Sequence, residues 1–439
     1  MSRHVSSRLN RRTLVQAGAA GVAAAALTRG GALAQTPVAS PALEALPAYD
    51  GSEVTISYGI WDSAQEEGIL QQIAAFNEEF PDITVELQLT PWADYWTKLQ
   101  TAVAGGEAFD VFWLNSANCP VYASAGALVP LQQLFEDGSL DAANYPESVL
   151  SLYNYKGVQY ATPREYDTIG LFYNKDIFDE VGEPYPDESW DWAKLREVAE
   201  RLADEDAGRW GLGLHLSGQE NYTNFIFQNE GKMLNEERTL CVLADDQNSA
   251  EAIQYNVQLF VDGLTPGVDI QQANPVPETL FPAGQVAMML GGSFRAKTYA
   301  DLDINVDVAP MPKGKVQATV IHGLGNVVWS GSKNQGAAIE FAKFLAGETA
   351  ERILGESGMG IPAWMGLEST WTDSMPDMNA QVFVDASAYG VNVPDPEVGP
   401  EWQGRIGEEM LKGFAGETPV EDVPQAAQDS ANEVLPGGA

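Results

Sequence analysis

Histidine and cysteine are scarce in this chain of 439 residues. It has three His, one of them at position 4, and two Cys, so the side chains that usually hold zinc are too few and too scattered to form a site. No HExxH segment, paired CxxC, GxSxG elbow or lysine-bearing phosphate loop occurs. These absences argue against the corresponding metalloprotease, hydrolase and nucleotidase classes, and we expect no metal site and no cofactor.

Positive charge is also scarce. The sequence has 24 Lys and Arg against 62 Asp and Glu, which gives a formal net charge of −38. Such a surface repels nucleic acid and anionic lipid, so we expect no nucleic-acid partner and interpret the acidic excess as a solubilising surface. With so many carboxylates, a secreted glycosidase, which needs only two, stays open as an alternative.

The apolar run near the N-terminus is short. Residues 17–27 are apolar, follow Arg11 and Arg12, and precede the small-residue site 32–34. Eleven residues are too few to span a bilayer, and the pattern resembles a twin-arginine export signal cleaved after about Ala34. No Cys follows to accept a lipid, so we expect export to the periplasm or the cell wall and extracellular face, with residues 35–51 as a flexible tether.

The chain beyond this leader alternates predicted strands and helices. Residues 54–61 form a strand, a capping box of Ser63 and Glu66 opens a helix, residues 83–89 alternate as a strand, and a helix rich in aromatics precedes a strand over 110–115. This order predicts a mostly parallel sheet with helices on both faces.

A second series of the same kind follows position 167. A hairpin turning at Gly157 and a charged loop over 164–167 lead to predicted strands at 169–173, 211–216, 285–290 and 304–309. Ser189 and Asn248 are the expected caps of the helices between them. Two α/β lobes are the economical interpretation. Cys119 and Cys241 fall in different lobes, and we expect two separate buried thiols.

Several segments in a fixed order resemble one protein family. They are TPREYDTIGLFYNKDIF with SWDW, FNEEFPDITVE with YWTKLQTAVAGG, DVFWL, LFPAGQVAMMLGGSF, APMPKG and GMGIPA. The chain from about 54 to 423 resembles the extracellular solute-binding proteins of bacterial ABC importers, in particular the sugar and maltodextrin-binding group. The resemblance implies a two-lobed periplasmic-binding-protein fold, type II-like, whose lobes each have a mostly parallel sheet flanked by helices.

The resemblance also implies three crossovers that act as a hinge, near residues 164–168, 322–330 and 357–362. Lobe 1 would comprise 52–165 and about 328–358, and lobe 2 about 167–325 and 360–439. Ligands of open α/β sheets sit beyond the carboxyl ends of strands. Residues at those ends are therefore candidate contacts: Trp61, Asp62, Trp113, Asn115 and Ser116. Aromatic rings suit the C–H faces of a sugar, and amides and carboxylates suit its hydroxyls, although Asp62 is equally suited to cap a helix.

Further contacts follow from the resemblance alone. Asp167 takes the place of an acidic sugar contact, Glu220 and Tyr222 resemble an acid and aromatic pair, and Phe294 and Trp402 take the positions of stacking tryptophans. Arg164 and Arg295 near the predicted cleft would hold a carboxylate or phosphate, or else form salt bridges. His322 either lines the cleft or is structural. Asn115 and Ser116 replace charged residues of the group, which argues against a long maltodextrin.

The predicted function is that of a substrate-binding component of an ABC importer. It would act as a monomer, capture a mono- or oligosaccharide between its lobes and deliver it to membrane permease subunits without chemical reaction. One alternative is the same fold binding a polyamine, a polyol or an anionic solute. The other is a secreted carbohydrate-active enzyme.

Overall fold

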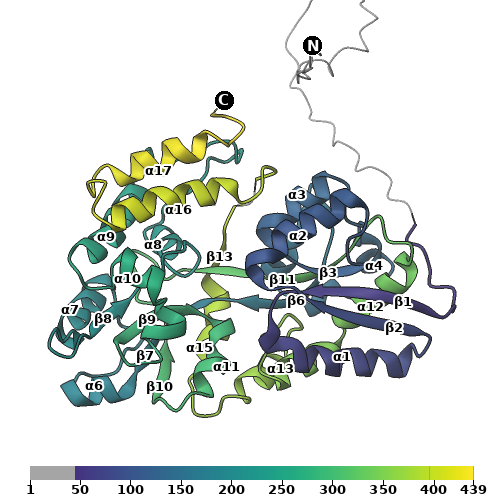
Figure 1. Cartoon of the computed structure of the whole chain (residues 1–439), viewed down its shortest axis with the longest axis horizontal. Coiled ribbons are helices and arrows are strands. Elements are labelled where there is room, and N and C mark those ends of the chain that lie inside the picture. Colours follow the sequence, from purple (N-terminus) through teal and green to yellow (C-terminus); the bar gives the residue numbers. More distant parts are fainter. Residues whose placement is uncertain (1–44, 395, 439) are drawn as a thin grey trace, which may run out of the picture. The chain divides into compact units, whose positions relative to one another are not determined.

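The computed structural model of the chain describes residues 45–394 and 396–438 (Figure 1). The predicted export signal and most of the predicted tether lie outside these residues. The last part of the tether is packed: the Leu46 amide donates to Gln133 Oε1 at 2.9 Å, and the Tyr49 ring contacts Phe80. Leu46 and Tyr49, expected to belong to a flexible tether, are therefore packed against the fold. Within the described ranges, no helix is long and apolar enough to cross a membrane.

One sheet has seven strands. They are β1 (Val54–Ile60), β2 (Ile83–Leu89), β3 (Val111–Asn115), β6 (Thr162–Asp167), β11 (Thr319–Val328), β12 (Ile361–Pro362) and β13 (Gly390–Asn392). The order is β12-β6-β11-β3-β1-β2, with β13 beside β11. β1 runs parallel to β2 and β3, and β11 runs antiparallel to β3 and β6. The carboxyl ends of β1, β2, β3 and β6 therefore lie at one edge of this sheet.

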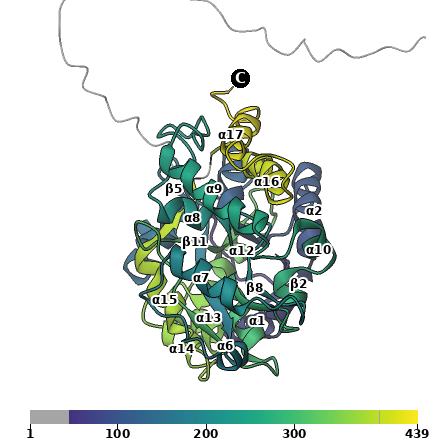
Figure 2. The ribbon, with the colours of Figure 1, turned by 90° about the vertical axis from the view of Figure 1, so that its left-hand side faces the viewer.

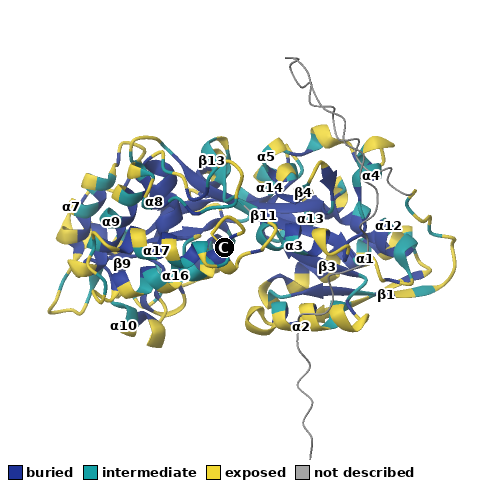
Figure 3. Ribbon diagram, turned by 90° about the horizontal axis from the view of Figure 1, so that it is seen from above, coloured by how far each residue is buried: buried dark blue, intermediate teal, exposed yellow. Residues whose placement is uncertain are grey.

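Helices cover both faces of this sheet, as expected. α1 (Glu66–Glu79), α12 (Gln335–Leu345) and α13 (Glu348–Glu356) share a core with one face, and α2 (Trp92–Gly105) and α3 (Cys119–Ser124) share a core with the other. Figure 3 shows buried strands between helices whose outer faces are exposed. The apolar stripe of α1 accounts for its side of the packing, because Ile69, Ile73 and Phe76 are all buried.

The second sheet has four strands, namely β7 (Ile169–Asn174), β8 (Trp210–Gly213), β9 (Val286–Gly292) and β10 (Val306–Ala309), in the order β10-β7-β9-β8. Only β8 and β9 pair in parallel, so the expectation of a mostly parallel sheet is wrong here. It does not hold for the first sheet either, where three strand pairings are parallel and three are antiparallel. β7 enters directly from β6 after the single residue Thr168. Because no helical crossover precedes it, β7 is not constrained to run parallel to its neighbours.

The helices that share the core on one face of the second sheet include α7 (Trp192–Leu202), α8 (Tyr222–Gln228), α9 (Gln247–Val261), α16 (Glu401–Phe414) and α17 (Val423–Asn432). α16 and α17 lie side by side against α9 (Figures 1 and 2). The opposite face packs on α11 (Ala296–Ala300) and α15 (Gln381–Ala386). The remaining elements are β4 (Asn154–Tyr155), β5 (Val158–Gln159), α4 (Gln132–Glu136), α5 (Glu147–Leu150), α6 (Lys175–Val181), α10 (Val268–Ala273) and α14 (Glu368–Thr372).

At the three helix starts where Ser63, Ser189 and Asn248 were the expected caps, a nearby aspartate is the cap instead. Asp62 accepts from the Ala64 amide at 2.9 Å and opens the 3-10 turn that leads into α1, where Ser63 was expected to cap. Asp191 accepts from the Lys194 amide at the start of α7 in place of Ser189, and Asp246 caps α9 in place of Asn248. A carboxylate satisfies the free amides and also interacts favourably with the helix dipole.

The connections between the two sheets differ in part from expectation. Residues 164–167, predicted as a loop, are the buried end of strand β6, whereas the hairpin at Gly157, with φ of 82°, is confirmed. β12 still pairs with β6, and the chain reaches β7 only at α15, where Phe383 packs against Phe172. The third connection therefore lies after Pro362, later than expected. Cys119 and Cys241 are buried in different cores and form no disulfide with each other.

Candidate functional site

The carboxyl end of β6 carries a buried polar cluster. Asp167 faces His322 across the β6 and β11 pairing, with 3.6 Å between Asp167 Oδ2 and His322 Nδ1. The Ser293 hydroxyl donates to Asp167 Oδ1 at 2.8 Å, and its amide donates to the Thr168 carbonyl at 3.0 Å. Ser293 directly follows β9. This contact therefore joins the end of a strand in one sheet to the end of a strand in the other.

Burial decides the protonation of this pair. Asp167 is only 5% exposed, and burial raises its pKa to about 7, although the hydrogen bond from Ser293 and the charge of Arg164 act in the opposite direction. Burial also lowers the pKa of His322 to about 4. Near neutral pH the imidazole is therefore uncharged, and Asp167 is near its midpoint. The pair offers hydrogen bonds more than a fixed ionic charge.

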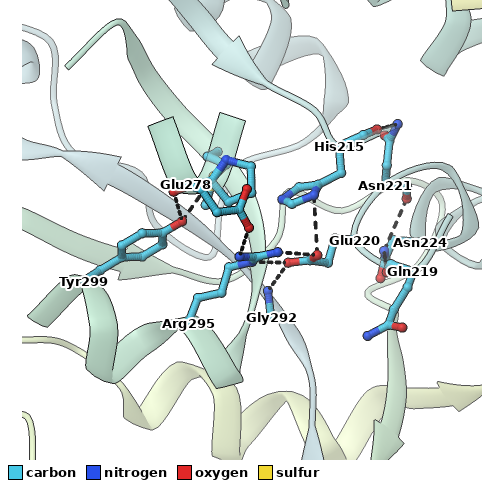
Figure 4. A network of polar contacts seen from close by, with 11 residues as sticks. His215, Gln219, Glu220, Asn221, Asn224, Glu278, Gly292, Arg295 and Tyr299 are labelled. Atoms are coloured by element: carbon cyan, nitrogen blue, oxygen red, sulfur yellow. Dashed lines mark hydrogen bonds and ion pairs between the residues drawn. The ribbon is translucent and has the colours of Figure 1, made fainter. Parts of the chain in front are cut away.

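A second cluster surrounds Glu220 (Figure 4). Its Oε1 accepts from Arg295 Nε at 2.7 Å and from the Gly292 amide at 3.0 Å, and its Oε2 accepts from Arg295 Nη2 at 3.0 Å. His215 Nδ1 lies 3.4 Å from the same Oε2. Burial alone would raise the pKa of Glu220, but His215, Arg295 and these hydrogen bonds lower it to about 2. Glu220 is therefore ionised, and both of its carboxylate oxygens accept hydrogen bonds from Arg295 or Gly292.

Arg295 is neutralised from two sides. Besides Glu220, it contacts Glu278 through Nη1 at 3.0 Å, and its guanidinium lies 5.1 Å from the centre of the Phe294 ring. Phe294 is half-buried on the turn after β9 and also lies near His322, with 6.2 Å between ring centres. The structure thus brings together five of the predicted site residues, namely Asp167, Glu220, Phe294, Arg295 and His322.

Arg164 is buried and stabilises the fold through contacts with neighbouring side chains. It is buried beside Glu165, with which it forms an ion pair, and its Nη2 donates to Gln65 Oε1 at 2.6 Å. Its guanidinium stacks 4.5 Å from the centre of the Trp113 ring. Arg164 therefore forms a salt bridge, the alternative expected for it, but the pair is buried and not at the surface. Its charge is compensated inside the fold and is not free to hold an anionic solute.

Four more predicted residues lie along the edge where β1 and β3 end. Trp61, Asp62, Asn115 and Ser116 are all half-buried. Asp62 acts as the cap described above, and Asn115 accepts from the side chain of Asn118 at 2.8 Å. Each of these groups retains a partly exposed polar or aromatic surface at the strand ends.

Three predicted contacts are packed in cores. Trp113 is fully buried and donates from Nε1 to the Tyr58 hydroxyl at 2.6 Å. Tyr222 and Trp402 are buried in the core on the helical face of the second sheet. None of the three presents a ring face to solvent, so the expectation that they stack on a solute does not fit this structure. Their size and apolar area suit core packing.

Sequence reasoning missed His215, Ser293 and Glu278. His215 follows β8 and Ser293 follows β9. The rule that selected Trp61 and Asn115, namely residues just beyond a strand, would have selected these two only with the observed strand ends, because His215 lies inside the predicted strand 211–216 and the predicted strand 285–290 stops short of the end of β9. Glu278 carries no such signal, because its role depends on the distant Arg295. No group of three or more possible metal-ligating residues occurs in the described part of the chain.

Comparison with known proteins places the fold and the family. The family model for bacterial extracellular solute-binding proteins matches residues 61–352. The galactooligosaccharide-binding protein of Bacillus subtilis is 24% identical over 88% of this chain and 90% of its own length. The diacetylchitobiose binding protein of Streptomyces coelicolor is 23% identical over 79% of this chain and 81% of its own.

Solved structures of solute-binding proteins have a similar fold. An ABC substrate-binding protein from Listeria monocytogenes in complex with cycloalternan superposes with a TM-score of 0.81 at 26% identity, covering 86% of this chain and 98% of that one. A maltose-bound protein from T. maritima gives a TM-score of 0.73 at 19% identity, covering 87% and 100%. The expected two-lobed periplasmic-binding-protein fold is thereby confirmed, and the chain belongs to the family of bacterial extracellular solute-binding proteins.

Proposed function

We propose that this protein is the substrate-binding component of an ABC importer and captures an uncharged carbohydrate between its two lobes for delivery to a membrane permease. The observation that carries the proposal is the sheet edge with half-buried aromatic and hydrogen-bonding side chains where β1 and β3 end, continued by the Asp167 and His322 pair. Such groups suit the faces and hydroxyls of a sugar. The sugar ligands named for several relatives support the same class.

The charges of the site favour a neutral solute. Arg164 is compensated by Glu165, and Arg295 by Glu220 and Glu278, so neither guanidinium is free for an anionic solute. Glu220 is equally engaged, and the raised pKa of Asp167 weakens its charge, which leaves little to hold a polyamine. A neutral sugar needs no compensating charge.

The proposal includes no chemical step. We infer an exported monomer that binds and releases its solute unchanged, and membership in a solute-binding family supports this. Steady release of product from an oligosaccharide incubated with the purified protein would instead favour the enzyme alternative.

A thermal-shift panel tests the solute class. Neutral mono- and oligosaccharides, uronic acids and spermidine are each added to the purified protein. A ligand that binds only the native state raises Tm by mass action, so a neutral saccharide is expected to raise Tm while the charged compounds do not. A Tm response to spermidine or a uronic acid alone would contradict the proposal.

The placement of the site is tested with Asp167→Ala. The response of Tm to the best saccharide should fall in this variant, because a hydrogen-bonding group at the end of β6 is lost. Asp303→Ala, at an exposed acid before β10, serves as the matched control and should respond like the parent. Equal responses in both variants would show that the site lies elsewhere.

A further inference from the structure

We propose that residues 396–400 form a latch with the β4–β5 hairpin, and that this latch opposes closure of the lobes and so limits the affinity for the solute. This inference rests on the proposed function, because it needs a solute that closes the lobes. The central contact is an ion pair between Lys156 Nζ and Glu397 Oε1, 2.5 Å apart. The hydrogen bond with Lys156 lowers the pKa of Glu397, so both groups are charged near neutral pH.

The latch segment reaches from one lobe to the other. It lies between β13, which pairs with β11 in the first sheet, and α16, which belongs to the core of the second. Gly399, with a φ of 76°, lies so close to α3 that a Cβ there would be 2.6 Å from Val121 Cγ2. Tyr155 of the hairpin packs against the same core as α3. The segment therefore contacts two elements of the first lobe just before the chain enters the second.

The strand before the latch is shared between the lobes in the same way. Asn392 at the end of β13 donates from Nδ2 to the Ser148 carbonyl at 3.3 Å and to Ser151 Oγ at 3.1 Å, both in or beside α5 of the first lobe. Val391 and Val393 on either side of it pack against the core of the second. Successive side chains of a strand point in opposite directions, so this stretch bridges the lobes.

The backbone of the hairpin presents the lysine at an uncommon position. Lys156 has a φ of 52° and Gly157 a φ of 82°, and Asn154 Oδ1 accepts from the Gly157 amide at 3.0 Å to close the turn. Turns of this kind favour Asn or Gly at both central positions, because other side chains are crowded at positive φ. The turn thus keeps a charged side chain at its tip at a conformational cost, and such a cost points to a function.

The position of the latch gives the direction of its effect. In the first sheet β2 lies farthest from β6, with β11, β3 and β1 between them. Figure 3 shows α2, which follows β2, on one side of the molecule, and β13, β4 and α5 on the opposite side. Rotation about β6 and β11 that brings the lobes together on the side of α2 separates them on the side of the latch. Closure therefore breaks the Lys156–Glu397 pair.

The exposure of the pair sets the size of the effect. The two side chains are 67% and 53% exposed, so their attraction is weak and is screened by salt. A weak contact shifts the balance between open and closed lobes without preventing closure. Because solute binds to the closed lobes, its affinity falls by the same factor as the population of the closed state.

Isothermal titration calorimetry on Lys156→Asn, Glu397→Gln and the double variant tests the inference. Asn suits the positive φ of the turn, so this change removes the charge without straining the hairpin. The matched control is Glu348→Gln. Glu348 pairs with Arg352 inside α13 at similar exposure, so the control changes the net charge equally and leaves the lobes untouched. Far-UV circular dichroism and Tm without solute establish that each variant is folded.

The probe is whichever malto-, galacto- or chito-oligosaccharide raises Tm most in the thermal-shift panel, titrated at about 0.01 and 0.5 M NaCl. At low salt each single variant should bind it about two- to fivefold more tightly than the parent, and the double variant no more tightly than either. The difference should shrink at high salt. Glu348→Gln should bind like the parent.

Carbodiimide coupling followed by mass spectrometry tests the contact itself, because the reagent joins a carboxylate to an amine that touches it. We expect a cross-link between Lys156 and Glu397 in the parent without solute. A saturating concentration of the same oligosaccharide should lower its yield, since closure separates the two groups. Lys156→Asn should give no such cross-link.

The outcomes separate this inference from the proposed function. Unchanged or weaker binding in the single variants, effects that add in the double variant, or a cross-link whose yield the solute does not lower would each overturn the latch, while the carbohydrate function stands. If no saccharide of any series binds, the proposed function fails and the latch falls with it, even where the cross-link forms.

Discussion

The carboxylate of Glu220 is surrounded by donors and holds several elements together. It receives Arg295 from the turn after β9, the Gly292 amide from the end of β9 and His215 from the segment after β8. Because both oxygens are engaged, Glu220 acts as a positioning residue that orients Arg295 and Phe294. A buried charge of this kind stabilises the fold only while its partners remain in place.

Glu220→Gln is therefore expected to destabilise the protein by about 2–4 kcal/mol at pH 7, because it leaves the mostly buried Arg295 without its main partner. The control is Glu278→Gln. It removes the other acid beside the same arginine, but Glu278 is 59% exposed and should contribute less than about 1 kcal/mol. Urea denaturation measures both. Equal losses would contradict the assignment of Glu220 as the anchor.

Asp167 predicts a pH dependence of stability. Its pKa is raised to about 7 in the folded protein from an unfolded value near 3.8. Between these values the unfolded state loses the proton and the folded state keeps it, so raising the pH through this window lowers the free energy of unfolding, by roughly 2–4 kcal/mol. Asp167→Asn keeps an acceptor for Ser293 but cannot ionise. The variant should therefore gain stability relative to the parent from pH 4 to 8.

Chemical denaturation at several pH values measures this difference. Asp303→Asn, which changes an exposed acid, is the control and should keep a constant offset from the parent. A constant offset for Asp167→Asn as well would mean that Asp167 ionises normally in the folded protein.

The sequence predicts which residues lie at the site better than it predicts what their side chains contact in the fold. Asp167, Phe294 and His322 follow from motif or strand-end position, and they do meet in the structure. The burial of Trp113 and Trp402 was not predictable, because a tryptophan near a strand end or a helix start has the same local pattern whether its ring faces solvent or a core. That distinction depends on residues distant in sequence.

At the scale of elements, local hydrophobic periodicity identifies the strands and helices. Strand direction and the extent of β6 depend on contacts between residues that are distant in sequence. β1, β2, β3 and β7 lie where their apolar patterns predict. The antiparallel pairing of β7 with β9 and β10 escapes prediction, because strand direction depends on the connection through Thr168. Residues 164–167 look like a loop for a related reason: their charged side chains are buried against hydrogen-bond partners such as Gln65 and Ser293, which are far away in sequence.

The close pairing of β6 with β11 gives an element-scale prediction. A Cβ at Gly323 would lie 2.2 Å from the Glu165 carbonyl oxygen on the neighbouring strand, and backbone cannot easily move away. Gly323→Ala should therefore destabilise the protein by about 1–3 kcal/mol. Gly404 in α16 has open space around its Cβ position, so Gly404→Ala should be neutral or stabilise by up to about 1 kcal/mol.

Thermal denaturation of the two variants checks this contrast. The paired design separates steric crowding between strands from a general effect of replacing glycine. If Gly323→Ala were as stable as the parent, the strands would have to be farther apart than the structure places them.

At the scale of the whole molecule, one property acts everywhere at once: a formal net charge of −38. Ion pairs such as Arg196 with Glu200 and Arg352 with Glu348 compensate acids locally, but 24 basic residues cannot compensate 62 acidic ones. The remaining acids repel one another across the compact folded state more than across an extended chain. This repulsion opposes folding and is screened by salt.

Tm at pH 7 is therefore expected to rise as NaCl increases from about 0.01 to 0.5 M, since the screening length falls from about 30 Å to a few ångströms. The same titration near pH 4.2, the isoelectric point calculated from the sequence, is the internal control, because little net charge is left there to screen. The rise in Tm should shrink or vanish at that pH. Differential scanning calorimetry measures both series. A fall of Tm with salt at pH 7 would instead mean that local ion pairs, which salt weakens, outweigh the repulsion among the unpaired acids.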